Sequence, residues 1–142
     1  MSWLSRKDKI IFLIFTLLSG ILAYYIHSFV EMKEENVIAF FSIVTGFLMT
    51  AVGLIYASNI RKILYKTNSK GYPSSWSKLI AYYRFSIFYF IFLIFVYIVK
   101  ISAIPEGIYK VIYLTTLLGG IYWLIKVFNS LFYLLSAEVN GK

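Results

Sequence analysis

The chain has 142 residues, of which 61% are apolar, 20% aromatic and 14% charged, and its formal net charge is +8. Soluble domains average roughly 45–50% apolar and about 25% charged residues, and a chain of this length has too little interior to bury so much apolar surface. The composition therefore excludes a soluble globular domain, a disordered segment and a solenoid, and it indicates an integral membrane protein. The sequence contains no Cys, which excludes a disulfide framework and cysteine-based metal sites or nucleophiles.

Four apolar stretches are long enough to cross a bilayer as helices, which takes about 20 residues each. The first two are uncharged over 10–30 and 36–60. The last two have uncharged centres of 15 residues, which span only about 22 Å, so their helices must extend past flanking basic residues whose side chains reach the membrane surface. We expect transmembrane helices at about 10–30, 36–58, 79–101 and 108–127.

The links between these helices are short and rich in residues that break helices. Residues 27–36 are polar, 67–75 contain Gly71 and Pro73, and 104–107 form a tight Pro-containing turn. Short links make neighbouring helices antiparallel, so we predict an all-α polytopic membrane protein of two antiparallel hairpins in one domain, 1–142. A basic loop, 59–78, joins the hairpins, and a tail, 128–142, follows the last helix. The first apolar run lacks a small-x-small cleavage site, so we expect it to be a retained span rather than a signal peptide.

The charges are distributed unequally between the two predicted sides. The side that holds both termini and the 59–78 loop carries eleven basic residues against two acidic ones, and the other side carries three against four. Basic residues near membrane spans stay cytoplasmic, so we expect both termini to lie in the cytoplasm. The membrane that we expect is a prokaryotic inner membrane. This rule and the anionic lipids of the inner leaflet account for the net charge, and no nucleic-acid partner is expected.

Small residues recur at helical spacing on three of the predicted helices. Such faces let membrane helices approach closely; we expect them to pack helices within one chain, with subunit contacts or a pore wall as the alternatives. The third helix is almost without small residues between 82 and 97, so we expect it to face lipid, with an aromatic groove for a partner as the alternative. The small-residue positions are Ser42, Gly46, Thr50, Gly53 and Ala57 on the second helix, Thr16 and Gly20 on the first, and Gly119 and Gly120 on the fourth.

The sequence offers little for catalysis or coupled transport. No Asp or Glu lies within the four predicted spans, which argues against proton- or sodium-coupled transport. His27 is the single His, either hydrogen-bonded at the membrane interface or sensing pH near its ordinary pKa of about 6.5. We expect no enzyme activity, metal site or cofactor, because catalytic metal sites need about three protein ligands and no phosphate loop or nucleophile motif occurs.

Several basic residues lie at or near the membrane boundary. Arg84, Lys126 and His27 are the candidates for pore or gating positions, although the two basic residues also fit flanking residues that reach towards the surface. We expect the second helix to continue beyond the membrane over 59–66 as an amphipathic stub against lipid headgroups. Residues 128–136 form a similar segment or a helix continuation. Candidates for contact with headgroups or a cytoplasmic protein partner are Arg61, Lys62, Lys66, Lys70 and Lys78.

The layout resembles small four-span membrane proteins of prophage exclusion and phage defence, of the lambda Rex type. The resemblance rests on chain length, on the second span FSIVTGFLMTAVGLIYAS, on the basic loop NIRKILYKTNSK, and on Val127 and Phe128 with Leu131 and Tyr133 beyond the last span. It implies a membrane effector that depolarises an infected cell under the control of a cytoplasmic sensor. No residue role is transferred by it.

The function that the sequence favours is an oligomeric inner-membrane effector that forms an ion-conducting or permeabilising pore. The first alternative is a sensor or anchor subunit that recruits a cytoplasmic partner through 59–78 and 128–142. An immunity or holin-like protein shares the same gross features, and a small transporter or enzyme remains as the last alternative.

Overall fold

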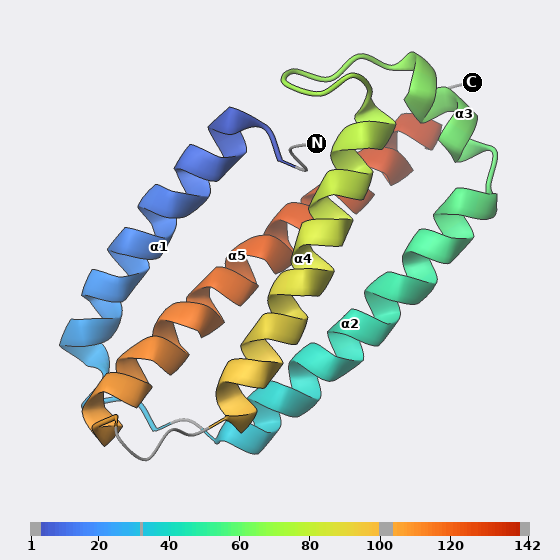
Figure 1. Cartoon of the computed structure of the whole chain (residues 1–142). Coiled ribbons are helices and arrows are strands. Elements are labelled where there is room, and N and C mark those ends of the chain that lie inside the picture. Colours follow the sequence, from blue (N-terminus) through green and yellow to red (C-terminus); the bar gives the residue numbers. More distant parts are fainter. Residues whose placement is uncertain (1–3, 32, 100–103, 140–142) are drawn as a thin grey trace.

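The computed structural model describes residues 4–31, 33–99 and 104–139, and these residues form five helices and their connections (Figure 1). Four of these helices are long and apolar enough to cross a membrane; in the last of them this holds for Glu106–Tyr133. The predictions of an all-helical chain and of four candidate membrane spans are therefore confirmed. The helices are α1 (Arg6–Ile26), α2 (Glu34–Ala57), α3 (Ile60–Lys66), α4 (Ser75–Ile98) and α5 (Glu106–Val139).

Serine caps explain why two helices begin earlier than the apolar runs predicted. The Ser5 side chain accepts a hydrogen bond from the Asp8 backbone N–H at the start of α1, and Ser74 accepts one from Ser77 at the start of α4. An N-cap satisfies backbone donors that would otherwise lack partners, so the polar first turn remains helical. The third span was predicted to end at residue 101, and residues 100 and 101 lie outside the described part of the chain.

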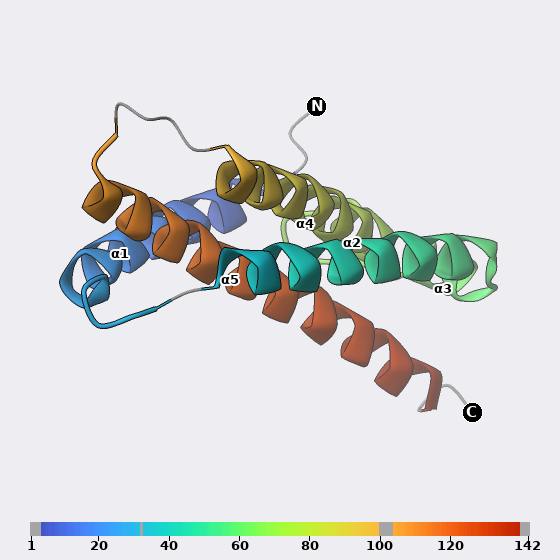
Figure 2. The same ribbon diagram turned by 90° about the horizontal axis from the view of Figure 1, so that it is seen from below.

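The second and last spans also end differently from the expectation. Ser58 has extended backbone angles and ends α2, so α3 is a separate short helix rather than a continuation of α2. In contrast, α5 continues through the predicted tail as far as Val139. Figure 2 shows its C-terminal end projecting away from α2 and α3. The last residues of the tail, 140–142, lie outside the described part of the chain.

The long helices stand in the lateral order α1, α5, α4, α2 (Figure 1). Helix α5 packs against both α1 and α4, and α4 packs against α5, α2 and α3. The chain therefore contains a packed α4–α5 hairpin, whereas α1 and α2, which follow each other in the chain, lie at opposite edges of the row. The contacts at the two edges differ accordingly: Gly20 of α1 lies next to Thr115 of α5, whereas the Phe41 ring of α2 packs against the Phe90 ring of α4.

The core lies around α4, and its largest fully buried side chains include Trp123, Tyr83, Phe41 and Phe90. In an apolar stretch of 18 residues of each span, buried residues make up 39% for α4 and 33% for α5, but only 11% for α1 and 17% for α2. The expectation of a lipid-facing third span is thus wrong for one whole face of α4. The bulky aromatic residues of that face fill the space between α5 and α2, while the opposite face, with Phe88 and Phe95, is exposed.

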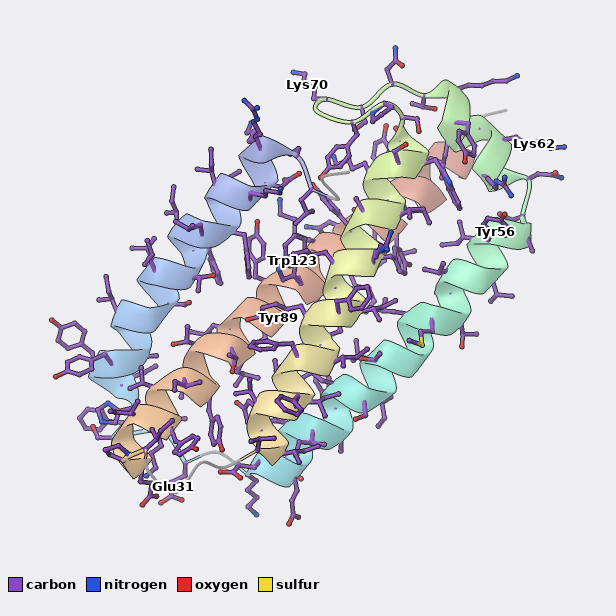
Figure 3. The ribbon with its side chains drawn as sticks, viewed as in Figure 1. Glu31, Tyr56, Lys62, Lys70, Tyr89 and Trp123 are labelled. Carbon is purple, nitrogen blue, oxygen red and sulfur yellow. The ribbon has the colours of Figure 1, made fainter. Side chains whose placement is uncertain are left out.

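Two consecutive glycines of α5 permit this close packing. A side-chain carbon at Gly119 would collide with the Tyr89 hydroxyl, and one at Gly120 would lie 2.8 Å from Phe41 Cζ and 2.9 Å from Leu93 Cδ1. Figure 3 shows Tyr89 and Trp123 pointing into the space between the helices. These two small residues let α5 approach α4 and Phe41 of α2 closely.

Candidate functional site at the basic end

Charged residues separate to the two ends of the helices. At one end of the bundle α1 and α4 begin and α2 ends, and we call this the basic end. Lys62 and Lys70 lie at the basic end, and Glu31 lies at the other end (Figure 3). Helix α5 begins at Glu106 at the opposite end. Lys126 follows Glu106 by 20 residues, or about 30 Å of helix, so it also lies at the basic end. Asp8 is the one acidic residue among the described side chains of this end.

Asp8 is buried at the centre of a polar cluster that joins three segments of the chain. Its Oδ2 accepts hydrogen bonds from Ser5 Oγ at 2.7 Å and from the Tyr72 hydroxyl at 2.7 Å. Its Oδ1 accepts one from the Tyr82 hydroxyl at 3.1 Å. We call these four residues the Asp8 cluster. Since both carboxylate oxygens have donors, the buried charge is compensated.

The loop between α3 and α4 is shaped so that Tyr72 reaches this carboxylate. Ser69 and Tyr72 form an isolated antiparallel bridge, and Gly71 between them has φ +81°, a conformation that favours glycine. The Tyr72 hydroxyl accepts a hydrogen bond from the Ser5 backbone N–H at 3.0 Å while it donates to Asp8. Burial, together with the neighbouring Asp8, raises the pKa of Tyr72 to about 12, so its hydroxyl keeps its proton at physiological pH.

Arg61 at the start of α3 is held by aromatic rings. Its guanidinium carbon lies 4.3 Å from the centre of the Tyr56 ring, 5.7 Å from that of Tyr65 and 6.0 Å from that of Trp76. These contacts connect the end of α2 and α3 to the start of α4. Arg61, predicted to contact headgroups or a partner, thus has a structural role here, whereas Lys62 and Lys66 are exposed.

A cavity of about 690 Å³ opens beside the Asp8 cluster, between α1, α4, α5 and the loop that precedes α4. Tyr82 connects the cavity to the Asp8 cluster, because its hydroxyl donates a hydrogen bond to Asp8. The centre of its ring lies 5.7 Å from Lys78 Nζ and 5.8 Å from Lys126 Nζ. The Lys126 ammonium also lies 5.6 Å from the centre of the Tyr122 ring. We call this space the lysine cavity, since Lys70, Lys78 and Lys126 all line it.

The small-residue positions of α1 and α2 have different surroundings. A side-chain carbon placed at Gly20 would lie 3.9 Å from Thr115 Oγ1 of α5. Thr16 is half-buried, and its hydroxyl donates a hydrogen bond to the Phe12 carbonyl oxygen. On α2 the five predicted positions are all exposed, and no described atom lies within 4 Å of a side-chain carbon placed at Gly46 or Gly53. The expectation that this face packs within one chain is therefore wrong for the described residues. We call it the α2 small face: Ser42, Gly46, Thr50, Gly53 and Ala57.

The remaining predicted positions are spread over the molecule. His27 follows the last residue of α1, and its Nδ1 lies 2.6 Å from the Tyr24 carbonyl oxygen. Arg84 lies on the exposed side of α4, and Lys126 lies in the lysine cavity. The structure thus brings together Lys70, Lys78 and Lys126, but not Arg84 or His27.

The Asp8 cluster was missed at the sequence level. A signal for part of it exists, because Ser5 and Asp8 have the Ser-x-x-acid spacing of an N-terminal helix cap. The long-range donors Tyr72 and Tyr82 lie 64 and 74 residues from Asp8, and no local pattern connects them. Among the described residues, no three His, Asp or Glu side chains are grouped so that they could hold a metal ion.

Comparison of the chain with protein-family models, curated proteins and solved structures found no match.

Proposed function

We propose that the protein is a homo-oligomeric membrane effector, in which copies of the chain associate through the α2 small face and together form a path for ions. In this proposal the membrane is a prokaryotic inner membrane and the basic end faces the cytoplasm, as the distribution of Lys and Arg favours. The observation that carries the proposal is the exposure of the α2 small face.

The α2 small face lies opposite the face that holds α2 in the chain. At 100° per residue, Gly46 is about 160° from Leu48, which is fully buried against the core. Membrane helices associate through small residues, because these let the backbones pack closely. A face of this kind at the edge of the helix row supports a contact with another copy.

The open row of helices also supports a pore made of several copies. Because α1 and α2 lie at opposite edges of the row, the four long helices do not close into a ring. The hydroxyl-bearing residues Ser42 and Thr50 of the α2 small face are exposed, and in an oligomer they would provide polar groups on a shared surface. The resemblance to phage-exclusion proteins also favours a permeation path of this kind.

Cysteine crosslinking tests the proposed contact cleanly, because the natural chain contains no Cys. Gly53→Cys and Leu54→Cys form a matched pair, since they are adjacent in sequence, lie at the same depth and are both exposed, but point about 100° apart. In native membranes under mild oxidation, we expect a strong disulfide dimer for Gly53→Cys and a weak one for Leu54→Cys. Equal crosslinking of the two variants would mean random collision and would contradict the proposal.

A sensor or anchor subunit is the second candidate, and the exposed lysines of α3 favour it. Lys62 and Lys66 present charge at the basic end while Arg61 fixes α3 to the aromatic residues beside it. A double variant, Lys62→Glu and Lys66→Glu, separates the two functions. Loss of a co-purifying cytoplasmic protein with unchanged ion flux would favour the sensor, and altered flux without such a loss would favour the pore.

A further inference from the structure

The lysine cavity changes from polar to apolar along α5. Lys126, Asn129 and Ser130 line it near the basic end, and Leu118, Ile121 and Ile125 line it deeper in the membrane. From 118 to 129 the helix rises by about 16 Å, close to half of a hydrocarbon core of about 30 Å. The cavity wall therefore has the polarity and the length of one lipid leaflet.

We propose that the lysine cavity binds one anionic phospholipid from the leaflet at the basic end. Lys70, Lys78 and Lys126 contact its phosphate, and an acyl chain lies against Leu118 and Ile121. Basic pockets between membrane helices are a recognised form of site for anionic headgroups. The site does not depend on whether the chain forms oligomers.

The charge of the cavity supports an anionic occupant. None of the described residues that line it is acidic, and none of its three lysines forms an ion pair within the described part of the chain. Asp8 interacts electrostatically with Lys126, but among the described residues it is the one acidic group beside three lysines, and its oxygens already accept hydrogen bonds from its cluster. The phosphate of a lipid supplies the missing negative charge.

The position of Lys126 is fixed without using its hydrogen-bond donors. The rings of Tyr82 and Tyr122 lie near the ammonium group and attract it through their π-electrons. The ammonium can therefore donate to phosphate oxygens without first leaving a carboxylate. Tyr82 is itself positioned by Asp8, so the Asp8 cluster acts as a support for the lipid site.

The experiment is a native mass spectrometry titration of the full chain in detergent micelles. The probes are dioleoyl phosphatidylglycerol, dioleoyl phosphatidylcholine and inorganic phosphate. The test variant is Lys78→Gln with Lys126→Gln; the control is Lys62→Gln with Lys66→Gln, which removes the same charge from exposed positions at the same end. A third variant, Ile121→Trp, fills the apolar part and leaves the lysines in place.

We expect one phosphatidylglycerol to bind in preference to phosphatidylcholine. In the test variant, the affinity for phosphatidylglycerol should fall by about 10- to 30-fold, as expected for the loss of two lysines near a headgroup. In the control it should fall by less than about 2-fold. In Ile121→Trp it should fall clearly. Equal losses in test and control variants would overturn the proposal, because binding would then follow the general surface charge. Unchanged binding in Ile121→Trp, or displacement of the lipid by inorganic phosphate, would overturn it as well, since the cavity would then hold an ion or headgroup alone. Circular dichroism of each variant verifies that the helices are intact.

Discussion

Replacing Gly120 by Ala tests how tightly α5 packs against its neighbours. The added carbon would lie 2.8 Å from Phe41 Cζ and 2.9 Å from Leu93 Cδ1, whereas ordinary contacts begin at 3.4 Å. Both neighbours are fully buried, so neither can turn into open space. Overpacking of this kind costs about 1–3 kcal/mol.

Gly46→Ala is the matched control, because a carbon placed there meets no described atom within 4 Å. Both variants gain the same helix propensity, about 1 kcal/mol for Ala over Gly, so the difference between them isolates the packing cost. The free energy of unfolding, measured with increasing SDS in micelles where the protein is monomeric, should be about 1–3 kcal/mol lower for Gly120→Ala than for Gly46→Ala. Equal stability of the two variants would refute the packing of α5 against α2 and α4.

Three further predictions concern the basic end. Asp8→Asn should lower the free energy of unfolding by about 1–3 kcal/mol, because charged acceptors form the stronger hydrogen bonds; no change in the SDS transition would contradict the Asp8 cluster. Burial and the adjacent Asp8 raise the pKa of Tyr72 to about 12, above the ordinary value of about 10, so its stabilising contribution is complete below about pH 10 and is lost as the pH rises through 12. The difference in tyrosinate absorbance between wild type and Tyr72→Phe measures this titration, and ionisation at the ordinary value would refute the burial of Tyr72. Arg61→Gln should cost about 0.5–1 kcal/mol through the lost contact with the Tyr56 ring and should change the emission of the nearby Trp76, and an unaltered spectrum would count against that contact.

The number and approximate limits of the long helices could be predicted, because a continuous apolar stretch of about 20 residues has few alternatives to a membrane helix. The starts of α1 and α4 were missed because the caps Ser5 and Ser74 extend the helices into polar sequence. The lateral order could not be predicted, since an apolar helix surface suits lipid and protein equally well. For this reason α4 was expected to face lipid and the α2 small face was expected to be covered within one chain.

The candidate site was predicted only as a set of charges. The sequence identified Lys70, Lys78 and Lys126 as basic residues near the membrane boundary, but not that they line one cavity. Their meeting depends on the contact of α5 with α4 and on the loop that carries Tyr72 to Asp8. These are long-range contacts, which no local spacing in the sequence encodes.

The most direct test of the proposed function is ion flux into liposomes that contain the purified protein. Gly46→Leu places bulk on the α2 small face, and Leu54→Phe places bulk on the same helix about 80° away. The account predicts that wild type and Leu54→Phe conduct ions as oligomers, and that Gly46→Leu is folded but monomeric and leaves the liposomes sealed. Sealed liposomes for folded wild-type protein, or equal flux for Gly46→Leu, would contradict it.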